Sequence, residues 1–300
     1  MFKQLFRKMA PNPLDRLLKK AQKKQQKRFL IAWNRGLGDI ALGLYAIVHR
    51  IREFIPDSTI TFIARENLKE GFTLLEGVDV LTVPSWKRGK SYTIREGLLE
   101  IGQDPAAYDV CIEHPDPTYW VKWQRGRLVP KLKWNPAWDA LWKKYGLKEE
   151  EFYIGVQPNT ETNYGFGRNW SLQKWQTLFD GVTQKEKVKI LLFGFEKEPH
   201  FSGEGIIDLR GQTSTYELLF IIKNRCFALV MLDSGISAMT YFLECSFPIK
   251  LVSLWGNPDM GILKQNVASP NPQLAHLPLL GDEGNINHIE VSQVEQAIFS

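Results

Sequence analysis

The sequence predicts an α/β protein built from two consecutive, doubly wound parallel sheets, and three observations support this prediction. Short apolar runs of strand length alternate with segments whose apolar residues recur at helical spacing. Such alternation is typical of parallel strands joined by crossover helices. The chain has 300 residues, which favours two domains, and a short polar segment, residues 146–151, separates a first alternating series from a second.

In the first half, residues 29–33 are predicted to form a buried strand and residues 40–55 a helix, which makes 35–39 a strand-to-helix turn. Further strands of this half are predicted at 59–64, 78–83 and 109–113.

The segment between residues 115 and 146 departs from the alternation and contains five of the ten tryptophans. Trp134, Trp138 and Trp142 recur at four-residue spacing, which favours a helix packed on a core over a binding surface. The piece 120–127 has no such period and is the better candidate for ligand contact.

The second half repeats the α/β pattern after the polar segment. Its predicted strands are 152–157, 188–194, 206–209, 227–232 and 249–254, and its predicted helices are 171–182, 215–223 and 237–245. The expected organisation is an N-terminal arm (1–28), an N-terminal domain (29–147), a C-terminal domain (152–284) and a C-terminal helix (285–300).

Basic residues are concentrated in the N-terminal arm. Residues 1–28 hold ten of the 38 Lys and Arg residues but one acidic residue, Asp15, of 33, so the rest of the chain is mildly acidic. Two interpretations fit an arm in which apolar residues are interspersed: a segment that lies on an anionic membrane, and a solvated, partly frayed basic helix. The acidic body and its irregular aromatics disfavour nucleic-acid binding.

Cysteine and histidine usage indicates neither a disulfide framework nor a metal site. The three cysteines form no C-x-x-C pair, and the five histidines are scattered, so we expect a reducing, cytoplasmic setting and no metal. No run approaches the roughly 18 apolar residues of a membrane span. P-loop, G-x-G-x-x-G, G-x-S-x-G and H-E-x-x-H motifs do not occur, which disfavours the commonest hydrolase, dehydrogenase, esterase and zinc-protease functions.

The turn Gly36-Leu37-Gly38-Asp39 is the first candidate site. In open α/β sheets such a turn opens onto the ligand crevice, and its glycines let the backbone approach a ligand closely. Asp39 then has two possible roles, as the cap of the following helix or as a base aimed into the crevice.

The second half offers an anion site at a similar junction. Asp233, Ser234 and Gly235 end a predicted strand, and the amide groups of the following helix would face an anion there. The polar loop 157–171 carries Arg168 just before a helix that Ser171 would cap. Arg168 is either a clamp for a phosphate or a surface arginine on a mobile loop.

Taken in order, these motifs resemble glycosyltransferase family 9, the bacterial heptosyltransferases of lipopolysaccharide core synthesis. The resemblance spans about residues 29–260. It rests on Gly36-Leu37-Gly38-Asp39, Arg168-Asn169-Trp170-Ser171, Leu209-Arg210-Gly211-Gln212-Thr213-Ser214, Asp233-Ser234-Gly235 and Trp255-Gly256-Asn257-Pro258-Asp259.

The resemblance implies a GT-B architecture, two Rossmann-like domains facing each other across a cleft, and an inverting, metal-independent glycosyltransferase without a cofactor. The donor would be a nucleotide-sugar such as ADP-heptose, and the acceptor a lipopolysaccharide-type or other envelope saccharide, with the arm at the inner membrane. Asp39 would be the general base, and Arg168 would neutralise the donor diphosphate. The remaining implied site residues are Thr160, Glu198, Asp233, Ser234 and Gly235 for the donor and Gly36, Gly38, Arg65 and Glu113 on the acceptor side.

The chain departs from the family pattern around both sites. Ala238 stands where the family usually has histidine, and Glu113-His114-Pro115-Asp116 replaces the family's Asp-x-Gln-Gly. Ser171 replaces a proline, and Asn257 a threonine or serine. These departures motivate an alternative, a catalytically divergent protein that still binds nucleotide-sugars.

Overall fold

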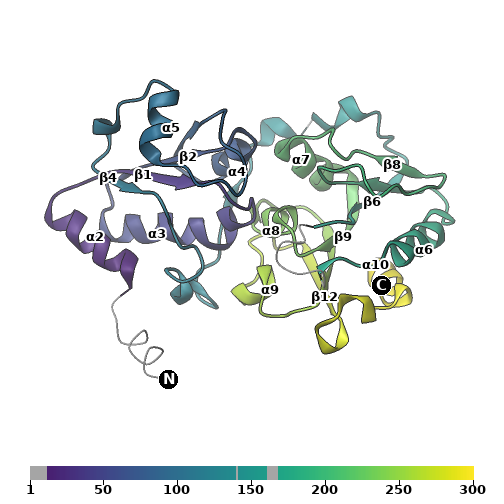
Figure 1. Ribbon diagram of the computed structural model, residues 1–300. Coiled ribbons are helices and arrows are strands. Elements are labelled where there is room, and N and C mark those ends of the chain that lie inside the picture. Colours follow the sequence, from purple (N-terminus) through teal and green to yellow (C-terminus); the bar gives the residue numbers. More distant parts are fainter. Residues whose placement is uncertain (1–11, 140, 161–167) are drawn as a thin grey trace. The chain divides into compact units, whose positions relative to one another are not determined.

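The computed structural model describes residues 12–139, 141–160 and 168–300. The chain divides into two compact units, Met1–Pro130 and Lys131–Ser300, each built on its own parallel sheet (Figure 1).

The sheet of the first unit has four parallel strands in the order β3-β2-β1-β4, as the alternating pattern predicts. The chain winds outward from β1 through β2 to β3 and then returns to place β4 on the other side of β1. The strand order therefore reverses between β1 and β4. The strands are β1 (Arg28–Trp33), β2 (Thr59–Ala64), β3 (Asp79–Thr82) and β4 (Val110–Ile112).

Helices cover both faces of this sheet, α5 on one and α3 on the other (Figure 1). On the α5 face, Ile94 and Leu98 pack with Leu30 and Ile63 in one buried cluster. The helical elements are α2 (Pro13–Lys23), the π-helical turn η1 (Ile40–Leu44), α3 (Tyr45–Phe54), η2 (Glu66–Leu68), α4 (Lys69–Thr73), α5 (Ile94–Glu100), η3 (Pro105–Ala107) and η4 (Lys122–Gln124).

The basic arm forms helix α2 from residue 13 onward. Asn12 caps it by accepting a hydrogen bond from the Leu14 amide at 2.9 Å, and Pro13 occupies its first turn. Leu14 and Leu18 are fully buried, and α2 lies along α3 (Figure 1). Residues 13–23 thus form a basic helix with exposed cations, as one interpretation expects, but the helix is not frayed, because its apolar side packs on the unit. Residues 1–11 lie outside the described part of the chain.

The second unit has a six-stranded parallel sheet in the order β12-β11-β9-β6-β7-β8. In chain order this is the 3-2-1-4-5-6 arrangement of a Rossmann fold, and its switch point lies between β6 and β9. The strands are β6 (Phe152–Gln157), β7 (Val188–Leu192), β8 (Ile206–Asp208), β9 (Cys226–Leu232), β11 (Ile249–Trp255) and β12 (Leu274–Leu280).

Helices α6 and α10 cover one face of this sheet, and α7 and α8 the other (Figure 1). Ser171 caps α6 as predicted, and Ser214 and Glu217 form a capping box at the start of α7. The helical elements are α6 (Leu172–Thr183), α7 (Thr215–Arg225), α8 (Gly235–Tyr241), α9 (Gly261–Gln265), η8 (Asp282–Gly284), η9 (Ile286–His288) and α10 (Val291–Phe299).

Two elements of this unit differ from the sequence expectation. The predicted helix 237–245 ends earlier, at Tyr241, and β10 (Leu243–Glu244) follows it. Strand β12 was not predicted, because it is a partly exposed edge strand containing Pro278 and so lacks a continuous apolar run.

The predicted tryptophan helix is wrong. Strand β5 (Leu132–Lys133) pairs with β10, and two 3₁₀ turns follow, η5 (Pro136–Trp138) and η6 (Leu141–Tyr145). Trp138 stacks on Tyr216 with ring centroids 4.1 Å apart, so this aromatic side chain does pack on the protein.

The same segment explains the boundary between the units. Because β5 pairs with β10, the chain joins the second unit at Lys131, and the expected linker 146–151 lies within that unit.

In the piece 120–127, the Gln124 side chain donates to the Leu42 carbonyl at 2.7 Å, and the Arg50 guanidinium lies over the Trp123 ring.

No helix among the described residues is long and apolar enough to cross a membrane.

Candidate functional site

In the first unit, three predicted site residues follow strands of one parallel sheet. Asp39 lies in the turn after β1, Arg65 comes directly after β2, and Glu113 directly after β4. Parallel strands end at a common edge, so these side chains belong to the carboxyl edge of the sheet, where open α/β sheets bind ligands. Asp39 and Glu113 follow the two strands that flank the switch point.

Asp39 does not act as a helix cap. It precedes η1 with helical backbone angles, and its carboxylate accepts no capping hydrogen bond from the amides that begin η1, all of which are described. A Cβ added to Gly36 would lie 2.9 Å from Asp39 Oδ2. The carboxylate therefore folds back over the turn, and the glycine at position 36 is what admits it.

The helix after Asp39 begins with a π turn, which is a feature enriched at functional sites. Gly43 in this turn packs so tightly that a Cβ there would lie 2.3 Å from the Pro117 carbonyl oxygen. Gly38 contributes through its backbone, because its carbonyl accepts from the Leu42 amide at 2.9 Å.

Arg65 and Glu113 have different environments at this edge. The Arg65 Nη2 donates to the Arg35 carbonyl at 2.9 Å, and its buried Nε has no hydrogen-bond partner among the described residues. Burial, with a contribution from the nearby Arg88, lowers the pKa of Arg65. Glu113 instead accepts from the Ile94 amide at 3.2 Å, which ties its carboxylate to the start of α5.

Asn34 lies at the same edge of the sheet, directly after β1, and sequence reasoning did not identify it as a residue of this edge. Its side-chain amide donates to the carbonyls of Lys87 and Lys90, both at 2.8 Å. This contact brings a basic loop to the turn after β1. The position of Asn34 directly after the first strand was the available signal.

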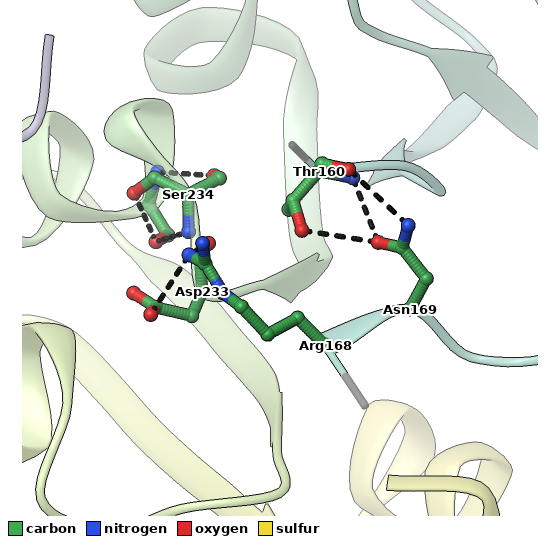
Figure 2. Close-up of polar contacts among 6 residues, drawn as sticks. Thr160, Arg168, Asn169, Asp233 and Ser234 are labelled. Atoms are coloured by element: carbon green, nitrogen blue, oxygen red, sulfur yellow. Dashed lines mark hydrogen bonds and ion pairs between the residues drawn. The ribbon is translucent and has the colours of Figure 1, made fainter. Parts of the chain in front are cut away.

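In the second unit, Arg168 and Asp233 meet at the switch point between β6 and β9 (Figure 2). The Arg168 Nη2 donates to the Asp233 backbone carbonyl at 2.6 Å and to its carboxylate Oδ2 at 2.9 Å. The two side chains are 19% and 16% exposed, respectively, so the pair is largely removed from solvent. The surface-arginine interpretation is therefore wrong.

Burial raises the pKa of Asp233, and the attraction of Arg168 opposes that rise. Gly261 closes over this carboxylate from the start of α9: a Cβ there would lie 2.3 Å from Asp233 Oδ1 and 2.7 Å from the Trp255 ring. Gly261 also has a φ of +48°, which favours glycine. Sequence reasoning did not identify it, because the contact joins segments distant in sequence.

Ser234 caps α8, which begins at Gly235. The Ser237 amide donates to Ser234 Oγ at 3.2 Å, and the Ser234 amide donates to Ser237 Oγ at the same distance. The Ser234 hydroxyl is thus engaged in capping. The first amides of α8, from Gly235 onward, have no earlier helical carbonyl to bond, which is the arrangement that favours an anion.

Thr160 and Asn169 close the base of the loop between β6 and α6 (Figure 2). The Asn169 Oδ1 accepts from the Thr160 amide at 2.9 Å and from its hydroxyl at 3.0 Å, and the Asn169 Nδ2 donates back to the Thr160 carbonyl at 3.2 Å. Asn169 was missed as a site residue, although it adjoins Arg168. Residues 161–167 of this loop lie outside the described residues.

The Glu198 carboxylate is 75% exposed and pairs with His200 Nε2 at 3.1 Å. Its backbone is nevertheless tied to the site, because Asn159 Nδ2 donates to the Glu198 carbonyl at 2.9 Å. Beside it, the buried Arg210 donates to the Pro199 carbonyl at 2.8 Å.

Within the described part of the chain, no group of three or more His, Cys, Asp or Glu side chains is placed to hold a metal ion.

The sequence matches no protein-family model and no curated protein. Solved structures, by contrast, resemble it over most of their length. A family 9 glycosyltransferase from Veillonella parvula aligns with a TM-score of 0.60 at 16% identity, covering 91% of this chain and 97% of its own. The E. coli ADP-heptose lipopolysaccharide heptosyltransferase II aligns with a TM-score of 0.61 at 15% identity and the same coverage.

The E. coli heptosyltransferase WaaC, solved with ADP, aligns with a TM-score of 0.51 at 14% identity, covering 91% of this chain and 99% of its own. At these identities the likeness establishes the fold alone. It agrees with the two parallel Rossmann-like sheets described above. The chain therefore has the GT-B fold of the family 9 heptosyltransferases, as its ordered motifs predict.

Proposed function

We propose that this protein is an inverting, metal-independent glycosyltransferase of family 9. In this proposal it moves a sugar from a nucleotide-diphosphate donor to a saccharide acceptor of the cell envelope. The observation that carries the proposal is the Arg168–Asp233 pair at the switch point of the second sheet, next to the first amides of α8. A cation and a helix N-terminus at one point suit a diphosphate.

Asp39 is the proposed general base. Its carboxylate takes the proton of the acceptor hydroxyl, whose oxygen then attacks the anomeric carbon of the donor sugar from the face opposite the diphosphate. The new carbon–oxygen bond forms as the bond to the diphosphate breaks, so the configuration inverts. The position of Asp39 in the turn after β1 and the close approach of its carboxylate over Gly36 support this role.

Arg168 stabilises the departing diphosphate in this proposal. Charge develops on the leaving phosphate oxygens, and a preorganised cation lowers the free energy of that transition state. The contacts of Nη2 with Asp233 hold the guanidinium at the start of α8 before the donor arrives. Asp233 is then a positioning residue for Arg168 and a hydrogen-bond acceptor for the donor.

The donor we favour is ADP-heptose. Two proteins of the same fold support this choice: the E. coli heptosyltransferase II is named for ADP-heptose, and WaaC was solved with ADP. The corresponding acceptor is a lipopolysaccharide-type saccharide. We further propose a cytoplasmic location with attachment to the inner membrane through residues 1–28.

A second candidate function is nucleotide-sugar binding without transfer. Ala238 favours it, because this residue is 1% exposed and has no polar side chain where the family pattern has histidine. The bond from the Ile94 amide to Glu113 also occupies an acceptor-side carboxylate.

A donor panel separates the two candidates. Calorimetry measures binding of each nucleotide-sugar to the intact protein, and mass spectrometry measures sugar transfer to envelope saccharides. Transfer that disappears in Asp39→Asn but persists in Asp282→Asn, a matched change in the other unit, supports catalysis. Binding without product across the whole panel supports the second candidate, and absence of both contradicts the proposal.

A further inference from the structure

Helix α2 carries a stripe of cations on its exposed side. The spacing of these residues, i, i+3, i+4, i+7 and i+8, puts them on one helical face, and all are exposed. None forms an ion pair with another described residue. This cationic stripe consists of Arg16, Lys19, Lys20 and Lys23 of α2 and of Lys24, the residue that caps its C-terminus.

The opposite side of α2 is occupied by the protein itself. Leu14 and Leu18 are fully buried, and Gln22 donates to the Phe54 carbonyl at 2.9 Å. The acidic residue of the helix, Asp15, is neutralised by Arg50, which bonds both of its carboxylate oxygens at 2.9 and 2.8 Å. The helix is thus anchored with its apolar side inward and its cations outward.

We infer that the cationic stripe docks the protein electrostatically on an anionic bilayer, without inserting the apolar side of α2. An amphipathic helix that lies in a membrane must bury its apolar face among the lipids, and here that face packs on the protein instead. The exposed side of α2 is the cationic stripe, and anionic lipids attract neighbouring Lys and Arg residues.

The charge distribution of the chain favours a bilayer over a nucleic acid as the partner. Outside residues 1–28, acidic residues outnumber basic ones, so the body as a whole has no net charge that would attract a long polyanion. The net positive charge lies in residues 1–28, the segment that contains α2. Eleven residues of α2 span roughly 16 Å, a length over which several lipid headgroups can face the stripe.

This inference deepens the membrane attachment in the proposed function and rests on it for the kind of partner. It differs from that proposal in its mode: purely electrostatic docking is released by salt, whereas an inserted apolar face holds at high salt. Its test needs no sugar transfer, so it can fail while the enzymatic proposal stands.

The experiment is sedimentation of the full-length protein with vesicles of phosphatidylcholine containing 30% phosphatidylserine, set against pure phosphatidylcholine. The variant replaces Lys19, Lys20 and Lys23 by glutamine. The control replaces Lys143, Lys148 and Lys187, three exposed lysines of the second unit, in the same way. Circular dichroism verifies that both variants keep the helix content of the parent.

We expect binding to anionic vesicles at low salt, release at about 0.5 M salt, and no binding to neutral vesicles. Each lysine lost from the stripe lowers the partition coefficient about fivefold, so the stripe variant binds on the order of 100-fold more weakly, and the control variant binds like the parent. Unchanged binding of the stripe variant overturns the inference. So does equal binding to neutral vesicles, or tighter binding to a duplex DNA oligonucleotide than to anionic vesicles.

Discussion

The Arg168 guanidinium donates from one nitrogen, Nη2, to both the backbone carbonyl and the carboxylate of Asp233 (Figure 2). This relationship joins the loop after β6 to the end of β9, the two strands at the switch point of the second sheet. The end of β9 therefore sets the orientation of Arg168, the cation of the proposed donor site.

Arg168→Ala should weaken both donor binding and the stability of the fold. The variant leaves the Asp233 carboxylate largely buried without its cation, so we expect the free energy of unfolding to fall by about 1–3 kcal/mol. Loss of a charged contact to the diphosphate should weaken donor binding by at least tenfold. Calorimetry with ADP-sugars and urea unfolding measure the two effects, and donor binding at parental strength would contradict the assignment.

Asp39→Asn should abolish transfer and spare donor binding. Removing a general base costs about 10²- to 10⁴-fold in rate, whereas the amide keeps the shape of the side chain. The measurement is kcat for sugar transfer together with the Kd for the donor. Turnover within threefold of the parent would remove Asp39 from the mechanism.

Two glycine substitutions near Asp39 should behave differently. The Cβ of Gly36→Ala meets the end of a side chain, Asp39 Oδ2, which can rotate away, so we expect a lower kcat with little loss of stability. The Cβ of Gly43→Ala meets the Pro117 backbone, which cannot move cheaply, so unfolding should become easier by about 1–3 kcal/mol. Thermal melts and kcat, measured on both variants, give the comparison; equal stability losses would show that the Asp39 side chain cannot rotate away from the new Cβ.

Asn169→Ala should raise the KM for the donor by loosening the loop that carries Arg168. The substitution removes the acceptor of the Thr160 amide and hydroxyl. Asn169→Asp keeps that acceptor but loses the Nδ2 donor to the Thr160 carbonyl, so it should retain only part of the affinity that alanine loses. A KM that is equal in the two variants would show that the Thr160–Asn169 contacts do not position Arg168.

Stability should fall between pH 6.5 and pH 4 because of His276. Burial lowers the pKa of His276 from 6.5 to about 4, and its Nε2 lies 2.7 Å from the Ser253 hydroxyl, which also accepts from the Trp255 indole N–H. The Ser253 oxygen thus lies between the indole N–H of Trp255, which donates to it, and the ring nitrogen of His276.

The sign of the effect follows from the protonation of His276 in the folded and the unfolded chain. As the pH falls below 6.5, the unfolded chain binds a proton at His276 that the folded chain does not, so the free energy of unfolding decreases until about pH 4. Urea midpoints at intervals from pH 7.5 to 4.5 measure this slope. His276→Gln should flatten it, and an unchanged slope in that variant would assign the effect to other groups.

The local patterns of the chain predicted much of the fold and named candidate site residues at strand ends. Apolar runs specify buried parallel strands on their own, and a strand followed by glycines or by Asp-Ser-Gly marks a ligand-facing turn without reference to any distant residue. The Ser171 cap was equally predictable, because a capping bond joins residues three apart.

Contacts between distant segments could not be predicted in this way. Trp134, Trp138 and Trp142 have helical spacing, yet this segment contains 3₁₀ turns. Strand β5 pairs with β10, and Asn135 and Pro136 then begin the first of the turns. Glu198 lies four residues after Gly194, and the pairing of its exposed carboxylate with His200 could not be read from that spacing.

The same distinction applies to the arm and to the donor site. Sequence alone established that residues 1–28 are basic and that Asp233 ends a strand, because composition and short-range pattern carry that information. The packing of Leu14 and Leu18 inward, and the meeting of Arg168 with Asp233, depend on surfaces brought together by folding. Burial and pair geometry are properties of the folded chain, so no local pattern contains them.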